Sequence, residues 1–398
     1  MITVWRRAAT VVSVFVFSTG VIVLGSPAAQ AIPATSTGSS PTGSLSARVG
    51  VDIEVTFESR DITFYGSLRT PTATRSSGIA VLLLPGSGPT DRNGNQKNAM
   101  VFPNTLAYLA DELASHGIPS LRFDKFGSGR TGLDDSALDA FDYGFDMQVD
   151  DAEAALNLLG ELTEATPART VVLGHSEGAL TALALQQRTN APGAGLGLLQ
   201  PLSQRYLDLL SEQINASLDR SVQSGQLLTS EADATRSSLA RTVQSLRENG
   251  VIPLDQDPLL GSVGLTPANE FLAEADRYDP VDIAAALADS LPVLIACSEE
   301  DLNVSCDQVE RLRSVVGAEA LTFTQLASAN HGLGEIGILA PGQFDAMGVC
   351  PENGVIDWFL TTFVRQTAVR RTLSRRHSVL PSIGWTSVGG RCLWDRGS

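Results

Sequence analysis

The chain has 398 residues, and its 43% hydrophobic and 18% charged residues are enough to build a packed core. Its formal net charge is −16, from 28 Lys and Arg against 44 Asp and Glu, so we expect no nucleic-acid partner, because phosphate contacts need cations. Four cysteines without a Cys-x-x-Cys pair, and only four histidines, exclude zinc fingers and iron–sulfur centres.

The N-terminus has the order of a secretory signal. Two arginines precede an apolar run over 8–25, and an Ala-Gln-Ala sequence follows at 29–31. This order predicts a cleaved signal peptide over 1–31 and a secreted protein. The alternative is an uncleaved membrane anchor, since the run is nearly long enough to span a bilayer. Residues 32–47, rich in Pro, Ser and Thr, predict a flexible leader.

The body alternates strand and helix patterns. Stretches 51–57 and 62–68 alternate apolar and polar residues, which predicts the edge strands of an antiparallel hairpin. A continuous apolar run over 79–84 that ends at Pro-Gly predicts a buried parallel strand, and further strands are expected at 119–123, 170–173, 194–199, 292–296 and 321–326. Helical periodicity predicts helices after Asn104, the expected N-cap, up to Gly117, and at 145–162, 178–187 and 357–365. Together they predict an α/β fold, with a mostly parallel central sheet covered by helices on both faces.

One segment interrupts this alternation. Residues 201–291 carry no strand pattern, but helical patterns occur at 206–218, 231–248 and 269–275. The segment is too long for a structureless loop, so we expect a helical cap inserted into a core made of 48–200 and 292–364.

The C-terminal residues 365–398 differ in charge from the acidic body. They contain seven arginines and one acidic residue. A basic tail of this kind is either a disordered extension or a segment that docks on the acidic body or another anionic surface.

The motif with chemical content is Gly-His-Ser-Glu-Gly at 174–178, between the predicted strand 170–173 and the predicted helix 178–187. At such a strand-to-helix turn the serine hydroxyl stands above the sheet, and the small flanking residues allow the tight turn. The start of the helix adds a positive dipole where negative charge develops. We therefore predict Ser176 as a nucleophile.

A serine hydroxyl needs a base to act as a nucleophile. His175 lies inside the motif, His116 precedes it at a predicted helix end, and His377 lies in the basic tail. His331 is the histidine of the body that follows Ser176, so it is the expected general base.

The acid that orients this base should follow the strand predicted at 292–296. Glu299, Glu300, Asp301 and Asp307 are the candidates there. Asp301 is the preferred residue and Glu300 is the second choice. Its carboxylate would accept the Nδ1 proton of His331 and stabilise the imidazolium.

An oxyanion hole needs two backbone N–H groups. One belongs to Glu177, the residue after the nucleophile, and the other to the glycine-rich loop over 85–95. Ser87 is the preferred second donor, with Gly88 as the alternative.

Four stretches together resemble a known family. They are the loop 85–95, the turn 123–129 (Phe-Asp-Lys-Phe-Gly-Ser-Gly), the motif 174–178 and Asn330-His331. The chain resembles the α/β-hydrolase superfamily, and within it the bacterial serine-aminopeptidase-like esterases, over about residues 50–364. It departs from them at Pro85-Gly86, where they often have His-Gly, and at Ser298, where the acid's strand often ends in Gly.

The cysteines suit an exported protein. Cys297 and Cys306 flank Asp301 in the sequence, so a disulfide between them would fix the loop that carries the acid. Cys350 and Cys392 would then tie the tail to the body. Four cysteines allow three pairings, and all three stay open at this point.

The sequence thus predicts a secreted serine hydrolase that cleaves carboxylic esters of small or medium acyl length through an acyl-enzyme, without metal or organic cofactor. The alternatives are an aminopeptidase or a thioesterase on the same residues, or a non-catalytic exported binding protein. An aminopeptidase would need an acidic group for the substrate amine, which Glu177 or a cap residue could supply. The pattern carries no indication of oligomeric state.

Overall fold

The computed structural model describes residues 50–72, 78–99, 101–133, 142–189, 193–262, 265, 269–327, 329–334, 358 and 362. The expected signal peptide, leader and basic tail lie outside these residues, as do Cys350 and Cys392. The helix expected at 357–365 falls outside them except for Trp358 and Thr362. Within the described ranges, no helix is both long and apolar enough to cross a membrane.

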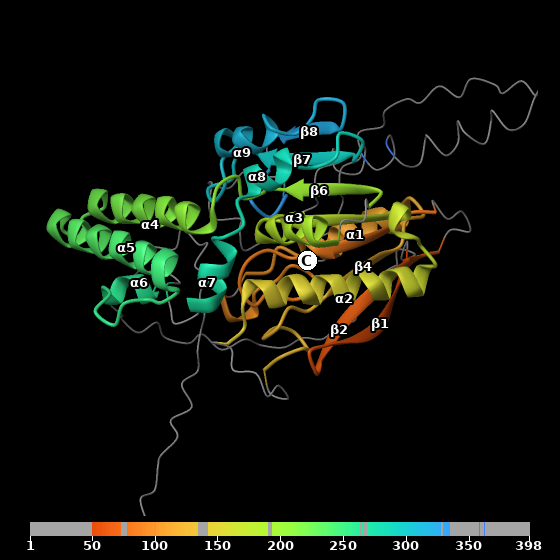
Figure 1. The fold of residues 1–398 in the computed structure, drawn as a ribbon, viewed down its shortest axis with the longest axis horizontal. Helices are drawn as coiled ribbons and strands as arrows, with labels where there is room; N and C mark the ends of the chain where they lie inside the picture. The colour runs from red at the N-terminus through yellow and green to blue at the C-terminus, as the bar shows by residue number, and fades with distance from the viewer. Residues whose placement is uncertain are drawn as a thin grey trace, which may run out of the picture.

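Among the described residues, eight strands form one sheet, in the order β1-β2-β4-β3-β5-β6-β7-β8 (Figure 1). Their bounds are Gly50–Ser59 (β1), Ile62–Pro71 (β2), Ala80–Leu84 (β3), Ser120–Phe123 (β4), Thr170–His175 (β5), Gly195–Leu199 (β6), Val293–Ser298 (β7) and Leu321–Leu326 (β8). β2 pairs antiparallel with β1 and with β4, and every other neighbouring pair is parallel. The predicted mostly parallel sheet is confirmed.

The hairpin of β1 and β2 forms as predicted, but the position of β2 in the sheet differs from the prediction. Arg60 and Asp61 have positive φ angles of 49° and 62°, as a two-residue turn between twisted strands requires. β1 lies at the edge, but β2 lies between β1 and β4, so the expectation that both are edge strands was wrong. Alternating polarity reports which faces are buried, whereas strand order depends on a partner distant in the sequence.

Helices cover both faces of the sheet. On one face, α1 (Thr105–Ser115) packs with Val81 and Leu83 of β3. On the other, α2 (Phe145–Thr163) and α3 (Glu177–Thr189) pack with Leu82 and Leu84 of the same strand. Alternate residues of one buried strand thus face two separate cores, which explains its continuous apolar sequence.

Asn104 stands at the N-cap position of α1 but does not cap it. Its backbone is left-handed, with φ 54°, and no side-chain hydrogen bond to the helix start is formed. Instead its Oδ1 accepts a hydrogen bond from Asn95 Nδ2 at 2.9 Å, and its N–H donates to Asn95 Oδ1 at 2.9 Å. The capping prediction was wrong because Asn104 is engaged by the loop before the helix. At the other end, His116 contacts the Glu112 carbonyl and Gly117 has a φ of 78°.

Helices fill the segment between β6 and β7. They are α4 (Tyr206–Gln223), α5 (Thr229–Asn249), α6 (Pro258–Ser262), α7 (Asn269–Ala275) and α8 (Pro280–Ala285). α4, α5 and α6 lie together beside the sheet, away from β1 and β2 (Figure 1). α8 was not predicted as a separate helix; it packs mainly on α3 and on α9 (Cys306–Arg313).

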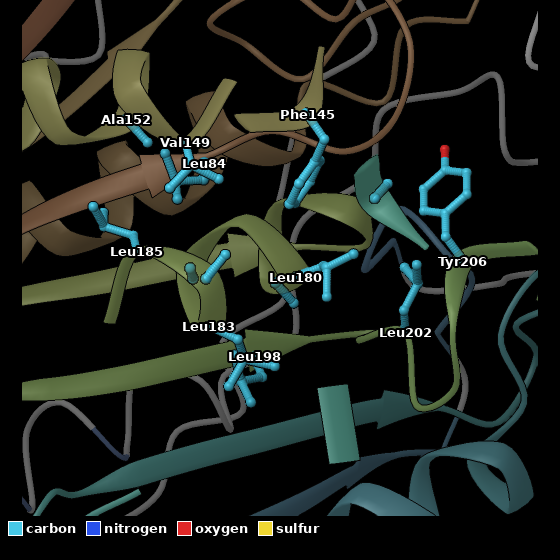
Figure 2. Close-up of a cluster of buried hydrophobic side chains, with 14 of the residues drawn as sticks. Leu84, Phe145, Val149, Ala152, Leu180, Leu183, Leu185, Leu198, Leu202 and Tyr206 are labelled. Carbon is cyan, nitrogen blue, oxygen red and sulfur yellow. The ribbon is translucent and has the colours of Figure 1, made fainter. Parts of the chain in front are cut away.

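The cap and the core share one hydrophobic cluster. Figure 2 shows Phe145 of α2, Leu180 of α3, Tyr206 of α4 and Leu202, which precedes α4, among its buried side chains. Phe271 of α7 meets both Phe145 and Tyr206 in edge contacts with ring centroids 5.7 and 6.1 Å apart. Helix α4 is therefore anchored on the core at its first turn.

Candidate active site

The residues singled out in the sequence follow the carboxyl ends of neighbouring parallel strands. Ser87 follows β3, Ser176 follows β5, Asp301 follows β7 and His331 follows β8. In open α/β sheets this edge is where ligands bind. The fold therefore gathers residues that are far apart in the sequence along one side of the sheet.

Ser176 occupies the turn between β5 and α3. Its φ is 55°, a left-handed value that is uncommon for a residue with a side chain. Its N–H donates to the Leu199 carbonyl at 2.8 Å, and its own carbonyl accepts from Ala179 at 2.9 Å. These bonds and its burial, at 3% exposed, over-determine a strained conformation of the kind often found at functional sites.

The two glycines of the motif are required by close backbone contacts. A Cβ at Gly174 would lie 2.1 Å from the Gly178 carbonyl oxygen, and one at Gly178 would lie 2.5 Å from the Leu84 oxygen. The turn can therefore pack against itself and against β3 only without side chains at these two positions.

His331 is paired with Asp301. The His331 Nδ1 to Asp301 Oδ2 distance is 2.8 Å, and the Asp301 side chain is fully buried. The second oxygen, Oδ1, accepts the N–H groups of Asn303 at 2.7 Å and Val304 at 2.9 Å. The competing acids Glu299, Glu300 and Asp307 are all exposed.

A disulfide closes the loop that carries Asp301. Cys297, the fifth residue of β7, is bonded to Cys306, the first residue of α9, nine positions away. This pairing is the one favoured by the positions of the two cysteines around Asp301. The loop is thus held at its base by a covalent bond and at its tip by the Asp301 carboxylate.

His175 links the serine turn to His331. Its Nε2 lies 2.7 Å from the His331 carbonyl oxygen, and the two rings have centroids 5.0 Å apart. Burial, helped by the neighbouring charge of His331, lowers the pKa of His175 to about 4. His175 is therefore neutral at ordinary pH, and its Nε2–H donates to that carbonyl.

The loop over 85–95 comes close to Ser176. A Cβ at Gly86 would lie 3.4 Å from Ser176 Cβ. The Ser87 carbonyl accepts hydrogen bonds from Thr90 Oγ1 at 2.7 Å and from Gln96 Nε2 at 2.6 Å. These two bonds fix the conformation of the loop.

Glu177 is the centre of a buried polar cluster that sequence reasoning missed. Its Oε1 accepts from Lys125 Nζ at 2.8 Å and Gln148 Nε2 at 3.1 Å, and its Oε2 accepts from Tyr206 Oη at 2.8 Å. Lys125 and Glu177 are almost fully buried, and the ion pair joins residues 52 positions apart. The available signal was the charged Asp-Lys pair directly after the buried strand β4, at the edge where ligands bind.

Asp124, the neighbour of that lysine, holds the same loop. Its carboxylate accepts the Arg92 backbone N–H at 2.8 Å and pairs with Arg92 Nη2 at 2.6 Å. A Cβ at Gly129 would collide with this carboxylate at 2.2 Å, so Gly129 leaves the space that Asp124 occupies.

A narrow cavity of about 10 Å³ lies at Ser176, close to the smallest volume that holds a water molecule. Its lining residues are Ser87, Ser176, Glu177, Leu202, Tyr206, Leu209, Leu210 and Gln213. Four of them belong to one face of α4, so the cap forms the roof of the cavity.

No three His, Cys, Asp or Glu side chains lie close enough to hold a metal ion in the part of the chain that the structure describes.

The profile of a known family matches residues 104–334, more than half of the chain, and its description is serine aminopeptidase, S33. The chain belongs to this family. The match includes Ser176, Asp301 and His331, while the loop that carries Ser87 precedes it. The resemblance and the α/β-hydrolase fold expected from the sequence are both confirmed.

A relative of this S33 chain carries the name esterase. Esterase EstD of Thermotoga maritima is 28% identical over 279 residues, which are 69% of this chain and 60% of that protein. The chain therefore spans less than two thirds of that relative's length.

Solved structures also resemble the S33 chain at low sequence identity. Proline iminopeptidase of Mycobacterium smegmatis is 19% identical, with a TM-score of 0.49, over 79% of this chain and 100% of its own. Est1E from Butyrivibrio proteoclasticus is 12% identical, with a TM-score of 0.46, over 80% and 99% of the two chains.

Proposed function

We propose that the chain is an exported serine hydrolase that cleaves carboxylic esters of small acyl groups. Ser176 is the nucleophile, His331 the general base and Asp301 the acid that orients it. The observation that carries this proposal is the 2.8 Å contact between His331 Nδ1 and a fully buried Asp301, beside the strained turn of Ser176.

The reaction follows the order of acyl transfer. Ser176 Oγ bonds to the ester carbonyl carbon while its proton passes to His331 Nε2, and the Asp301 carboxylate stabilises the imidazolium. The N–H groups of Ser87 and Glu177 stabilise the oxyanion. The alcohol leaves with the proton from His331, and water then releases the acid by the same route.

Three observations favour an ester over an aminoacyl amide. The relative EstD is named an esterase, although the family is described as a serine aminopeptidase. An aminopeptidase needs a carboxylate for the substrate ammonium, and both oxygens of Glu177, the acid nearest Ser176 in sequence, already accept hydrogen bonds. The cap leucines around the cavity also suit an uncharged acyl group.

Two features support export, the N-terminal segment and the disulfide. The segment 1–31 has the order of a signal peptide, and the disulfide between Cys297 and Cys306 is typical of oxidising compartments. N-terminal sequencing of protein recovered outside the cell tests it, with Ile32 as the expected first residue.

Covalent labelling tests the proposed mechanism. A fluorophosphonate probe should modify Ser176 in a protein made of residues 32–398. The variant Ser176→Ala should abolish both labelling and ester hydrolysis. Among nitrophenyl esters, the acetate should be cleaved fastest, and Leu210→Ala should extend cleavage to longer chains by enlarging the cavity. No label on the folded wild-type chain would contradict the mechanism. Faster cleavage of aminoacyl amides than of esters would replace the ester proposal by the aminopeptidase alternative.

A further inference from the structure

The Gly86–Ser87 peptide and the lysine behind it suggest how the oxyanion hole is held. Lys125 is 6% exposed, and its Nζ lies 2.8 Å from Glu177 Oε1 and 3.1 Å from the Gly86 carbonyl oxygen. A buried ammonium group with two fixed acceptors has little freedom to move. It therefore constrains both groups that it contacts.

The peptide that joins Gly86 to Ser87 is trans, as are all peptide bonds among the described residues. In a trans peptide the C=O and the N–H point in opposite directions. Lys125 therefore directs the Ser87 N–H away from itself by binding the Gly86 oxygen. Ser87, Ser176 and Glu177 line the same cavity.

Glu177 connects the two expected oxyanion donors. Its backbone N–H is one of them, and its side chain binds the lysine that orients the other. Tyr206 Oη donates to Glu177 Oε2 at 2.8 Å, and burial next to this carboxylate raises the pKa of Tyr206 well above 10. The tyrosine therefore stays a proton donor.

We propose that Lys125 is a positioning residue of the oxyanion hole, which fixes the Gly86–Ser87 peptide so that the Ser87 N–H points at the developing oxyanion. The inference rests on the function proposed above. The competing explanation is that Lys125 only neutralises the buried charge of Glu177. The two differ in what happens when both charges are removed together.

The test compares Lys125→Met with the double variant Lys125→Met/Glu177→Gln. The single variant leaves a buried carboxylate without its cation and should be less stable. The double variant is neutral at both positions and should regain stability, but the Gly86 oxygen still lacks its donor. We expect its kcat for nitrophenyl acetate to be about 10- to 100-fold below wild type, with KM within about twofold, because oxyanion contacts act mainly in the transition state.

A matched control is Arg60→Met/Asp151→Asn. Asp151 is also a buried carboxylate that binds a cation, Arg60, and a tyrosine hydroxyl, Tyr143 Oη at 2.6 Å. It lies on the next turn of α2 after Gln148, outside the residues that line the cavity. This variant should change stability but leave kcat close to that of wild type.

Inhibitors separate positioning from general binding. A trifluoromethyl ketone forms a tetrahedral adduct with the serine, whereas the matching methyl ketone resembles the substrate. The double variant should lose affinity for the first in proportion to its kcat and keep its affinity for the second. Wild-type kcat in the double variant, or an equal loss of affinity for both ketones, would overturn the proposed role of Lys125 but not the proposed function. A wild-type chain that neither hydrolyses the ester nor reacts at Ser176 would overturn both this role and the proposed function.

Discussion

The loops on the two sides of Ser176 are held by different interactions. On the side of the proposed oxyanion donors, here called the oxyanion side, the loop 85–95 is bound to the buried ion pair of Lys125 and Glu177. On the side of the proposed acid and base, here called the acid–base side, the Asp301 loop is closed by a disulfide, and His331 is bound through its backbone to the neutral His175. A buried ion pair depends on both of its charges, whereas a disulfide holds its loop at any pH. The comparison teaches that the two loops should respond differently to the loss of charge: the loop 85–95 depends on a buried ion pair, whereas the Asp301 loop also has a covalent restraint.

The largest expected effect is on the acid–base side, from Asp301→Asn. The asparagine Oδ1 can keep the bonds from Asn303 and Val304, but its Nδ2 would face His331 Nδ1 and favour the wrong tautomer. We expect kcat to fall by about 10⁴-fold while the fold is retained. Ester kinetics with a circular dichroism control measure this, and a variant within tenfold of wild type would argue against Asp301 as the acid.

The second effect concerns His175, which joins the two sides. Its pKa of about 4 in the folded chain lies below its ordinary value of 6.5. The unfolded chain binds a proton first as the pH falls, so folding stability is lost between pH 6.5 and 4. The loss is up to about 3 kcal/mol.

The variant His175→Gln should remove this part of the pH dependence, because the glutamine amide can donate to the His331 carbonyl but does not titrate. Denaturant titrations of both proteins from pH 7 to pH 4 measure the difference. Since His331 and Asp301 remain in both, parallel curves would show that His175 is not the group responsible.

The third effect breaks the covalent restraint. Cys297 and Cys306 close a loop of about ten residues, for which chain entropy predicts a stabilisation of about 2–3 kcal/mol. Cys297→Ala/Cys306→Ala should lower the free energy of unfolding by this amount and reduce kcat less than Asp301→Asn does. Unchanged kcat together with the loss of stability would mean that the Asp301 hydrogen bonds alone hold the acid.

The smallest expected effect is at the contact between the cap and the acid–base side. Gln213 Nε2 on α4 donates to the Asn303 carbonyl at 2.9 Å, and Gln213→Leu removes this bond. A loss of about 1 kcal/mol is expected from thermal or denaturant unfolding. Gln244→Leu is the control, because Gln244 is exposed and bonds only to Glu248 within α5 among the hydrogen bonds of the described residues. Equal losses of unfolding free energy in the two variants would show that the bond from Gln213 to Asn303 adds no stability of its own.

Local patterns predicted the strands, the main helices and the turn of Ser176 because each depends on residues close in sequence. The order of β2 in the sheet and the side-chain partners of Asn104 depend on distant segments, and both were predicted wrongly. Lys125 was noted as part of a family-like turn, but its pairing with Glu177 needs the sheet to bring β4 and β5 together across β3. His331 and Asp301 could be named because chain order restricts the choice.

Helix α4 bonds to both sides, through Tyr206 to Glu177 and through Gln213 to Asn303. The two residues are seven positions apart, which is close to two helical turns and places them on one face. Removing a single residue between them would rotate one of the two by about 100° away from its partner. The rotation of α4 about its axis is therefore fixed relative to the sheet. An insertion or deletion between Tyr206 and Gln213 would break the contact of the cap with Glu177 or with Asn303, whereas one in α5 or α6 would leave both contacts in place.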